Sequence, residues 1–125
     1  DYMPDHTAVS RLVFDASFSA TLPNYPPKTD TPAKLVPIYY MDTLAGVNFV
    51  PTEFVDISDE IELKLKMLNC HESQIVWMHD HDHIDFPDMV KTCSRYRGYP
   101  CGVDYAEGFR MCQVYLKGTA KRLLP

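Results

Sequence analysis

Three of the chain's five histidines fall in one acidic segment, His79-Asp80-His81-Asp82-His83. Imidazole binds zinc, and residues two apart share one face of a strand, so these rings could hold an ion together. The same letters are typical of a solvated, helix-breaking loop between two short helices, and we favour that interpretation. Within the segment, His81 is kept as a residue that could contact a substrate.

A fourth histidine lies close to the start of the chain, in Met3-Pro4-Asp5-His6, ahead of an apolar run from Val9 to Phe18. Proline suits the first helical position, and an acidic residue in the first turn complements the helix dipole. His6 would therefore lie one turn into a helix, where it could ligate a metal. A capping Asp beside a surface His, with no further function, explains the same letters.

Two further clusters carry polar groups that could do chemistry. His71 is followed by Glu72-Ser73-Gln74 at an expected junction between helices, where side chains often cap backbone groups. Glu107 stands among small and aromatic neighbours in Tyr105-Ala106-Glu107-Gly108-Phe109. The structural alternatives are capping for His71 and an ordinary salt bridge or surface charge for Glu107.

The composition is that of a globular protein and excludes several function classes. The 125 residues include 46% hydrophobic and 23% charged residues, with 17 acidic and 12 basic side chains and a net charge of −5. No basic cluster favours nucleic acid, and no apolar stretch approaches the roughly 18 residues of a membrane-spanning helix. The sequence has no GxSxG motif, which would indicate a serine nucleophile, and no cluster of glycines, which would indicate a phosphate-binding loop. The four cysteines form no CxxC pair, so we expect buried or half-buried free thiols, with disulfides as the alternative in an oxidising compartment. We lean toward a cytoplasmic location.

Alternating helices and strands indicate the α/β class. The first helix should run from Pro4 to about Ala20 and bury one face, made of Val9, Leu12, Val13 and Ala16. Prolines predict a loop over 21–34. The other expected elements are helices over 60–70, capped by Ser58 or Asp59, 73–78 and 87–96, and strands over 36–40, 48–55 and 109–116. In 61–67 a strand-like alternation competes with the helix.

Taken in order, three groups of residues resemble the C-terminal half of the LmbE/PIG-L family of zinc-dependent N-acetylglucosamine de-N-acetylases. These groups are Asp1-Tyr2-Met3-Pro4-Asp5-His6, Lys66…His71-Glu72-Ser73-Gln74, and Arg97-Gly98…Gly102…Tyr105-Ala106-Glu107-Gly108-Phe109. The resemblance covers nearly the whole chain. It implies a three-layer, Rossmann-like α/β fold, with residues 1–125 forming the C-terminal portion of a single domain.

The resemblance also implies a zinc site that this chain completes only in part. Two zinc ligands and the catalytic base of the family come from an N-terminal His-Pro-Asp-Asp motif, which this sequence lacks. The third ligand comes from a later His-Pro-Asp-His motif and corresponds to His6. The Asp of that motif corresponds to Asp5, which is therefore expected to be a catalytic-site residue that supports the neighbouring side chains. An N-terminal half and an amino-sugar substrate are the implied partners. Residues expected to contact the substrate or to support the site are Tyr2, Met3, His71, His81 and Glu107.

One position departs from the family pattern. The first His of the later motif, which in the family polarises the amide carbonyl, is Met3 here, and a thioether cannot donate a hydrogen bond. Loss of one oxyanion donor typically costs about 10²–10³ in rate. The alternative to a deacetylase is therefore a non-catalytic module, or one of altered chemistry such as hydration, that binds a sugar or a protein partner. A homo-oligomer is left open.

Overall fold

The computed structural model describes residues 1–26 and 31–125, which divide into two compact units. Unit 1 consists of Asp1–Tyr40 and Met111–Arg122, and unit 2 of Met41–Arg110 and Leu123–Pro125. Part of the predicted loop over 21–34, namely residues 27–30, lies outside the described residues. Within the described ranges, no helix has the length and apolar character needed to cross a membrane.

Unit 1 begins with the predicted helix, α1, which spans Pro4–Ser19. Proline starts it and Asp5 lies in its first turn, as the sequence predicts. The prediction of a buried face is wrong for the described chain. No residue of α1 is buried, and Val9, Leu12 and Val13 are each half-exposed or more. The spacing of the apolar residues identifies one apolar face of the helix. That face would be buried only against a covering surface, which the described residues do not provide.

Outside α1, unit 1 is held by contacts between its two chain segments. The backbone N–H of Cys112 donates to the Ile38 carbonyl at 2.8 Å, and the buried Lys117 ammonium donates to the Val36 carbonyl at 3.2 Å. The strand expected over 36–40 is found as β1, Tyr39–Met41, whose last residue belongs to unit 2.

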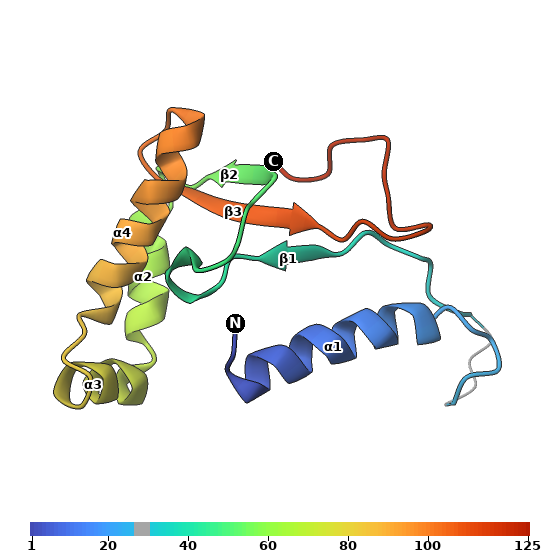
Figure 1. Cartoon of the computed structure of the whole chain (residues 1–125), viewed down its shortest axis with the longest axis horizontal. Helices are drawn as coiled ribbons and strands as arrows, with labels where there is room; N and C mark the ends of the chain where they lie inside the picture. Colours follow the sequence, from blue (N-terminus) through green and yellow to red (C-terminus); the bar gives the residue numbers. More distant parts are fainter. Residues whose placement is uncertain (27–30) are drawn as a thin grey trace. The chain divides into compact units, whose positions relative to one another are not determined.

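Three helices form one side of unit 2 (Figure 1): α2 spans Ile61–Asn69, α3 spans Glu72–Asp80, and α4 spans Phe86–Gly98. Helix α4 packs against both of the others. All three helices were expected, and in α2 the helix-forming residue types prevail over the strand-like alternation. The start of α4 is fixed locally, because the Asp85 carboxylate accepts a hydrogen bond from the Asp88 N–H at 3.0 Å. Two short 3₁₀ turns, Leu44–Gly46 and Tyr99–Cys101, complete the unit's helical segments.

Two antiparallel strands pair in unit 2: β2, Glu53–Asp56, and β3, Ala106–Met111. Glu53 faces Phe109 and Asp56 faces Ala106, and the Thr52 N–H extends the ladder by donating to the Phe109 carbonyl at 2.9 Å. The strand predicted over 109–116 therefore starts three residues earlier and ends at Met111. The one predicted over 48–55 begins only after Pro51, which has no N–H to donate. Phe49, Ile57, Ile61 and Ala106 are the buried apolar residues of this unit.

Ser58 does not cap α2 as predicted. The residue before the helix is Glu60, which provides no side-chain cap. Instead, the Asp56 carboxylate accepts hydrogen bonds from the Ser58 hydroxyl at 2.6 Å and the Ser58 N–H at 2.9 Å. These bonds hold the pKa of Asp56 below its usual value. The Ser58 hydroxyl in turn accepts from the Tyr105 N–H at 3.3 Å, so it ties the end of β2 to the start of β3.

Helices and strands are thus mixed, as the sequence predicts, and the observed strand pairing is a small antiparallel sheet. The three-layer Rossmann-like arrangement, and the assignment of residues 1–125 to part of one larger domain, stay predictions.

Gly98 offers a test of the packing where α4 ends. A Cβ at this residue would lie 2.5 Å from the Val103 carbonyl oxygen and 3.0 Å from backbone atoms of Asp104. We expect Gly98→Ala to lower the free energy of unfolding by about 1–3 kcal/mol, because the crowded atoms are backbone and cannot move aside. Urea unfolding followed by circular dichroism measures it. Gly118→Ala is the matched control, since its Cβ would meet nothing within 4 Å. Equal midpoints for the two variants would contradict the packing argument.

Candidate functional site

In unit 1, the imidazole of His6 is held by a carboxylate. Its Nδ1 lies 2.8 Å from Oδ2 of Asp1, and the two side chains are 49% and 20% exposed, respectively. A carboxylate on one ring nitrogen fixes the orientation of the ring and leaves the other nitrogen free for a ligand. His6 lies in the first turn of α1, so its backbone is also well defined. Asp1 was not among the predicted site residues, because only the folded start of the chain brings it to His6.

The other predicted residues of this segment are placed around the start of α1. Met3 is the N-cap residue, and its carbonyl accepts a hydrogen bond from the Thr7 N–H at 3.0 Å. Asp5 is an exposed first-turn residue, and Tyr2 is almost fully exposed. The carboxylate that supports His6 is therefore Asp1, where the family resemblance suggested Asp5.

The donor set fits zinc in type but not in number. Imidazole with a carboxylate on its second nitrogen is a common zinc-binding pair. Within residues 1–26 and 31–125, however, no group of three or more His, Cys, Asp or Glu side chains is arranged to hold a metal ion. His6 can supply one ligand, and a closed site needs others from outside the described residues.

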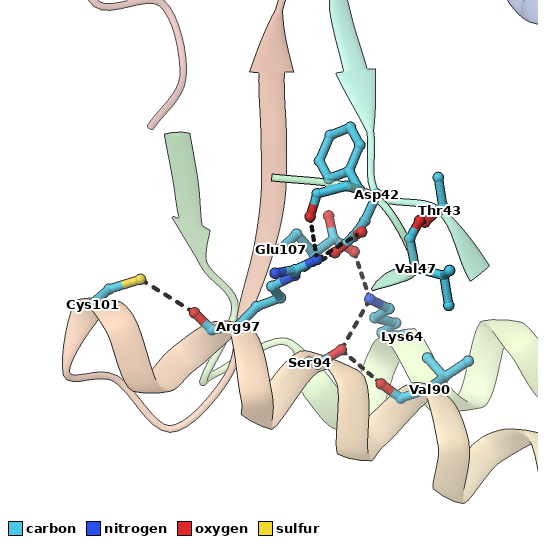
Figure 2. A network of polar contacts seen from close by, with 10 residues as sticks. Asp42, Thr43, Val47, Lys64, Val90, Ser94, Arg97, Cys101 and Glu107 are labelled. Carbon is cyan, nitrogen blue, oxygen red and sulfur yellow. Dashed lines mark hydrogen bonds and ion pairs between the residues drawn. The ribbon is translucent and has the colours of Figure 1, made fainter. Parts of the chain in front are cut away.

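Glu107 lies in a polar network inside unit 2 (Figure 2). Its Oε1 accepts a hydrogen bond from the Lys64 ammonium at 2.7 Å, and the same ammonium donates to the Ser94 hydroxyl at 3.2 Å. Lys64 belongs to α2, Ser94 to α4 and Glu107 to β3, so one cation joins three elements. Glu107 therefore forms a salt bridge with Lys64, which is the structural alternative that the sequence analysis gave for this residue.

Beside this network lies a buried ion pair that the sequence analysis missed. The Arg97 guanidinium donates from Nε to Oδ2 of Asp42 at 2.5 Å and from Nη2 to Oδ1 at 3.0 Å. Nη2 also donates to the Phe49 carbonyl at 3.2 Å (Figure 2). The Arg97 side chain is only 10% exposed, and the bond to Asp42 raises the pKa of the guanidinium. The only signal in the sequence was the place of Arg97 in the Arg97-Gly98 group.

Two glycines lie beside this arginine. A Cβ on Gly46, which has a φ of +70°, would lie 2.8 Å from Nη2 of Arg97. A Cβ on Gly108 would lie 3.5 Å from Nε of Arg97 and 3.0 Å from the Pro51 ring. The glycine in the loop thus makes room for the buried guanidinium, and the glycine in β3 makes room for the Pro51 ring.

The remaining histidines are placed on or beside α3. His71 is the exposed N-cap residue of this helix, at the expected junction, and gives no side-chain cap. His79 and His81 each pair with the following aspartate at 2.8 Å. The histidine segment is part helix and part loop, because α3 continues through Asp80. The four cysteines are free thiols, but only Cys112 is buried and Cys93 half-buried as expected, whereas Cys70 and Cys101 are exposed.

Comparison with known proteins gives a curated relative by sequence. No family model matches the chain. A diacetylchitobiose deacetylase of Thermococcus kodakarensis is 35% identical over 114 residues, which cover 86% of this chain and 39% of that protein. The chain therefore spans less than half the length of this curated relative.

Three solved structures resemble this chain. The conserved protein TT1542 from Thermus thermophilus matches with a TM-score of 0.74 at 29% identity, over 98% of this chain and 52% of that chain. The N,N'-diacetylchitobiose deacetylase of Pyrococcus horikoshii, solved with its inhibitor MPG, matches at 0.65 and 26% identity, over 90% of this chain and 41% of that one. GalB, the 4-carboxy-2-hydroxymuconate hydratase of Pseudomonas putida KT2440, shares the fold with a TM-score of 0.67 at 18% identity, over 96% of this chain and 51% of that one.

The two ion pairs of unit 2 should differ sharply in their contribution to stability. Asp42→Asn leaves the Arg97 guanidinium buried without its counter-charge, which typically costs about 3–5 kcal/mol. Glu107→Gln, the matched control, weakens a pair whose side chains are 31% and 39% exposed, and such pairs contribute about 0–1 kcal/mol. Urea midpoints of the two variants check the difference. A Glu107→Gln loss as large as that of Asp42→Asn would show that the buried pair is not the stronger constraint.

Proposed function

We propose that this chain, a member of the LmbE/PIG-L family, is part of a zinc-dependent de-N-acetylase. Its membership of the family rests on its 35% identity to a diacetylchitobiose deacetylase. The substrate class is an N-acetylated amino sugar or a conjugate of one. The observation that carries this proposal is the pair formed by His6 and Asp1 in a chain whose sequence and structural relatives include deacetylases of diacetylchitobiose.

In this proposal, His6 binds the metal through Nε2. Asp1 accepts from Nδ1, which keeps the proton on that nitrogen and the lone pair on the other. Zinc in a site with three protein ligands activates a water at neutral pH and polarises the amide carbonyl. The first turn of α1 holds the imidazole, and Pro4 fixes the backbone where that turn begins.

The other zinc ligands and the base are proposed to come from an N-terminal half, with the complete protein forming the three-layer fold. Two observations support this. The relatives are about twice as long as this chain or longer, since it covers only 39% to 52% of them. Helix α1 also exposes Val9, Leu12 and Val13 on its expected inner face. An apolar face of this kind needs a covering surface in the finished fold.

Metal binding should depend on His6 and Asp1 and not on the other histidine cluster. In the protein that also supplies the remaining ligands, we expect His6→Ala to lose its stoichiometric zinc. Asp1→Asn should weaken zinc affinity by about 10–100-fold, the usual effect of losing a carboxylate behind a ligating imidazole. Elemental analysis and competition with a chromogenic chelator measure both effects.

The control is a triple variant in which His79, His81 and His83 are all replaced by Ala. We expect it to retain its zinc. Loss of the metal in the triple variant, with full retention in His6→Ala, would move the metal site to the histidine segment.

Met3 favours a second candidate function, a module that binds sugar without hydrolysing it or that catalyses another reaction. A thioether cannot donate a hydrogen bond to a developing oxyanion. The likeness of this fold to a hydratase at 18% identity shows that the fold alone does not decide the chemistry. Tyr2, which precedes Met3 in the sequence and is almost fully exposed, has a hydroxyl that could replace the missing donor.

Substitution of Met3 separates the two candidates. If the missing donor limits hydrolysis, Met3→His should raise the rate of acetate release from N,N'-diacetylchitobiose by about tenfold, equivalent to about 1.4 kcal/mol of transition-state stabilisation. Tyr2→Phe is the companion variant, and a loss of activity in it would identify Tyr2 as the donor. If neither the parent nor Met3→His releases acetate from any acetylated amino sugar, the deacetylase proposal fails and the binding module replaces it.

A further inference from the structure

Trp77, the single tryptophan of the chain, lies on α3 with its ring stacked on that of His81. The ring centroids are 4.2 Å apart and the ring planes differ by 13°. The two residues are four apart, so they share one face of the helix end, and the His81 N–H donates to the Trp77 carbonyl at 2.9 Å. Although one ring face is covered in this way, Trp77 remains 56% exposed.

The stack is held rigid from the side of the histidine. Nδ1 of His81 lies 2.8 Å from Oδ1 of Asp82, which fixes the orientation of the imidazole. The chain turns sharply just beyond, because the Asp82 and Ile84 N–H groups both donate to the Met78 carbonyl and His83 has a φ of +56°. A tryptophan backed by an oriented imidazole loses little further freedom when a ligand covers its open face.

The groups around this ring suit a neutral sugar. An aromatic face carries partial negative charge, so it attracts the weakly positive C–H groups on the apolar face of a pyranose ring. Asp80 and Asp82 each engage a histidine through Oδ1 only, which leaves Oδ2 to accept hydrogen bonds from sugar hydroxyls. An aromatic surface together with carboxylate acceptors at the same helix end is a combination that suits a polyhydroxylated ring.

Other occupants fit less well. A metal ion is disfavoured, because no group of three potential ligands gathers in the described part of the chain. A stable protein partner usually buries about 800 Å² on each side, with a large apolar centre. Around Trp77 the exposed apolar surface is interrupted by the charged pairs His79–Asp80 and His81–Asp82.

We propose that Trp77, His81, Asp80 and Asp82 form a carbohydrate-binding platform that stacks one pyranose ring of an N-acetylglucosamine oligosaccharide. The choice of sugar rests on the proposed function, whereas the platform itself requires no metal and no hydrolysis.

The test uses the protein in a His6→Ala background, so that binding is measured without turnover, with tri-N-acetylchitotriose as the probe. Trp77→Ala should weaken binding measured by calorimetry by about tenfold, or about 1.4 kcal/mol. Val76→Ala, the control, removes a neighbouring half-exposed apolar side chain from the same helix and should change the dissociation constant less than twofold. Trp77→Phe keeps an aromatic face and should lie between the two.

Tryptophan emission gives a second readout. The difference between the emission of the Trp77 and Trp77→Phe proteins isolates this residue, and it should shift to shorter wavelength as the sugar saturates. An unchanged affinity in Trp77→Ala, or no binding at the highest soluble chitotriose concentration, overturns the platform. An emission change that depends on protein concentration without sugar would instead assign the surface to a second copy. Hydrolysis that survives in His6→Ala would refute the proposed metal site and leave the binding result to stand separately.

Discussion

The buried pairing of Arg97 with Asp42 is the constraint on which unit 2 depends. An uncompensated guanidinium at this depth would be strongly unfavourable, so the loop after β1 must return to α4 to deliver both the Asp42 carboxylate and the Phe49 carbonyl. Three residues of this loop, Ala45, Gly46 and Asn48, have positive φ, a conformation that is costly for side chains other than glycine. The loop is tolerable in this shape because the charge pair and its carbonyl partner hold it there.

Strand β3 runs beside the same arginine. Gly108 passes beside it without a side chain, and its neighbour Glu107 turns to Lys64, which also donates to Ser94 of α4. The group from Tyr105 to Phe109 thus serves as the joint between strand and helices. Its Glu has no need of a role in chemistry to explain its contacts. In the proposed platform, the residues of this unit that meet the sugar lie elsewhere, on the exposed end of α3.

The sequence predicts those parts of the fold whose causes are local. Pro4 and Pro87 mark the starts of α1 and α4 in the sequence, and the helices begin at Pro4 and at Phe86, one residue before Pro87. The bounds of β3 were wrong because they depend on pairing with β2, some fifty positions earlier in the chain. The ion pair of Arg97 joins residues 55 apart, and no period or spacing announces it. The prediction that one face of α1 is buried was wrong. The spacing of its apolar residues shows which face of a helix is apolar, but it does not show whether another segment covers that face.

The candidate metal site is incomplete in the described residues, because they supply only one ligand, His6. The contacts of His6 are local, to Asp1 and to the first turn of α1, so they form wherever this segment is helical. Zinc binding, in contrast, would require at least two further ligands from distant chain. In the proposed enzyme, the binding energy of the metal would therefore be gained only when α1 is assembled with those ligands, which makes metal affinity and assembly a single coupled equilibrium. Covering the apolar face of α1 would act in the same direction, because both effects favour the state in which His6 meets its partner ligands.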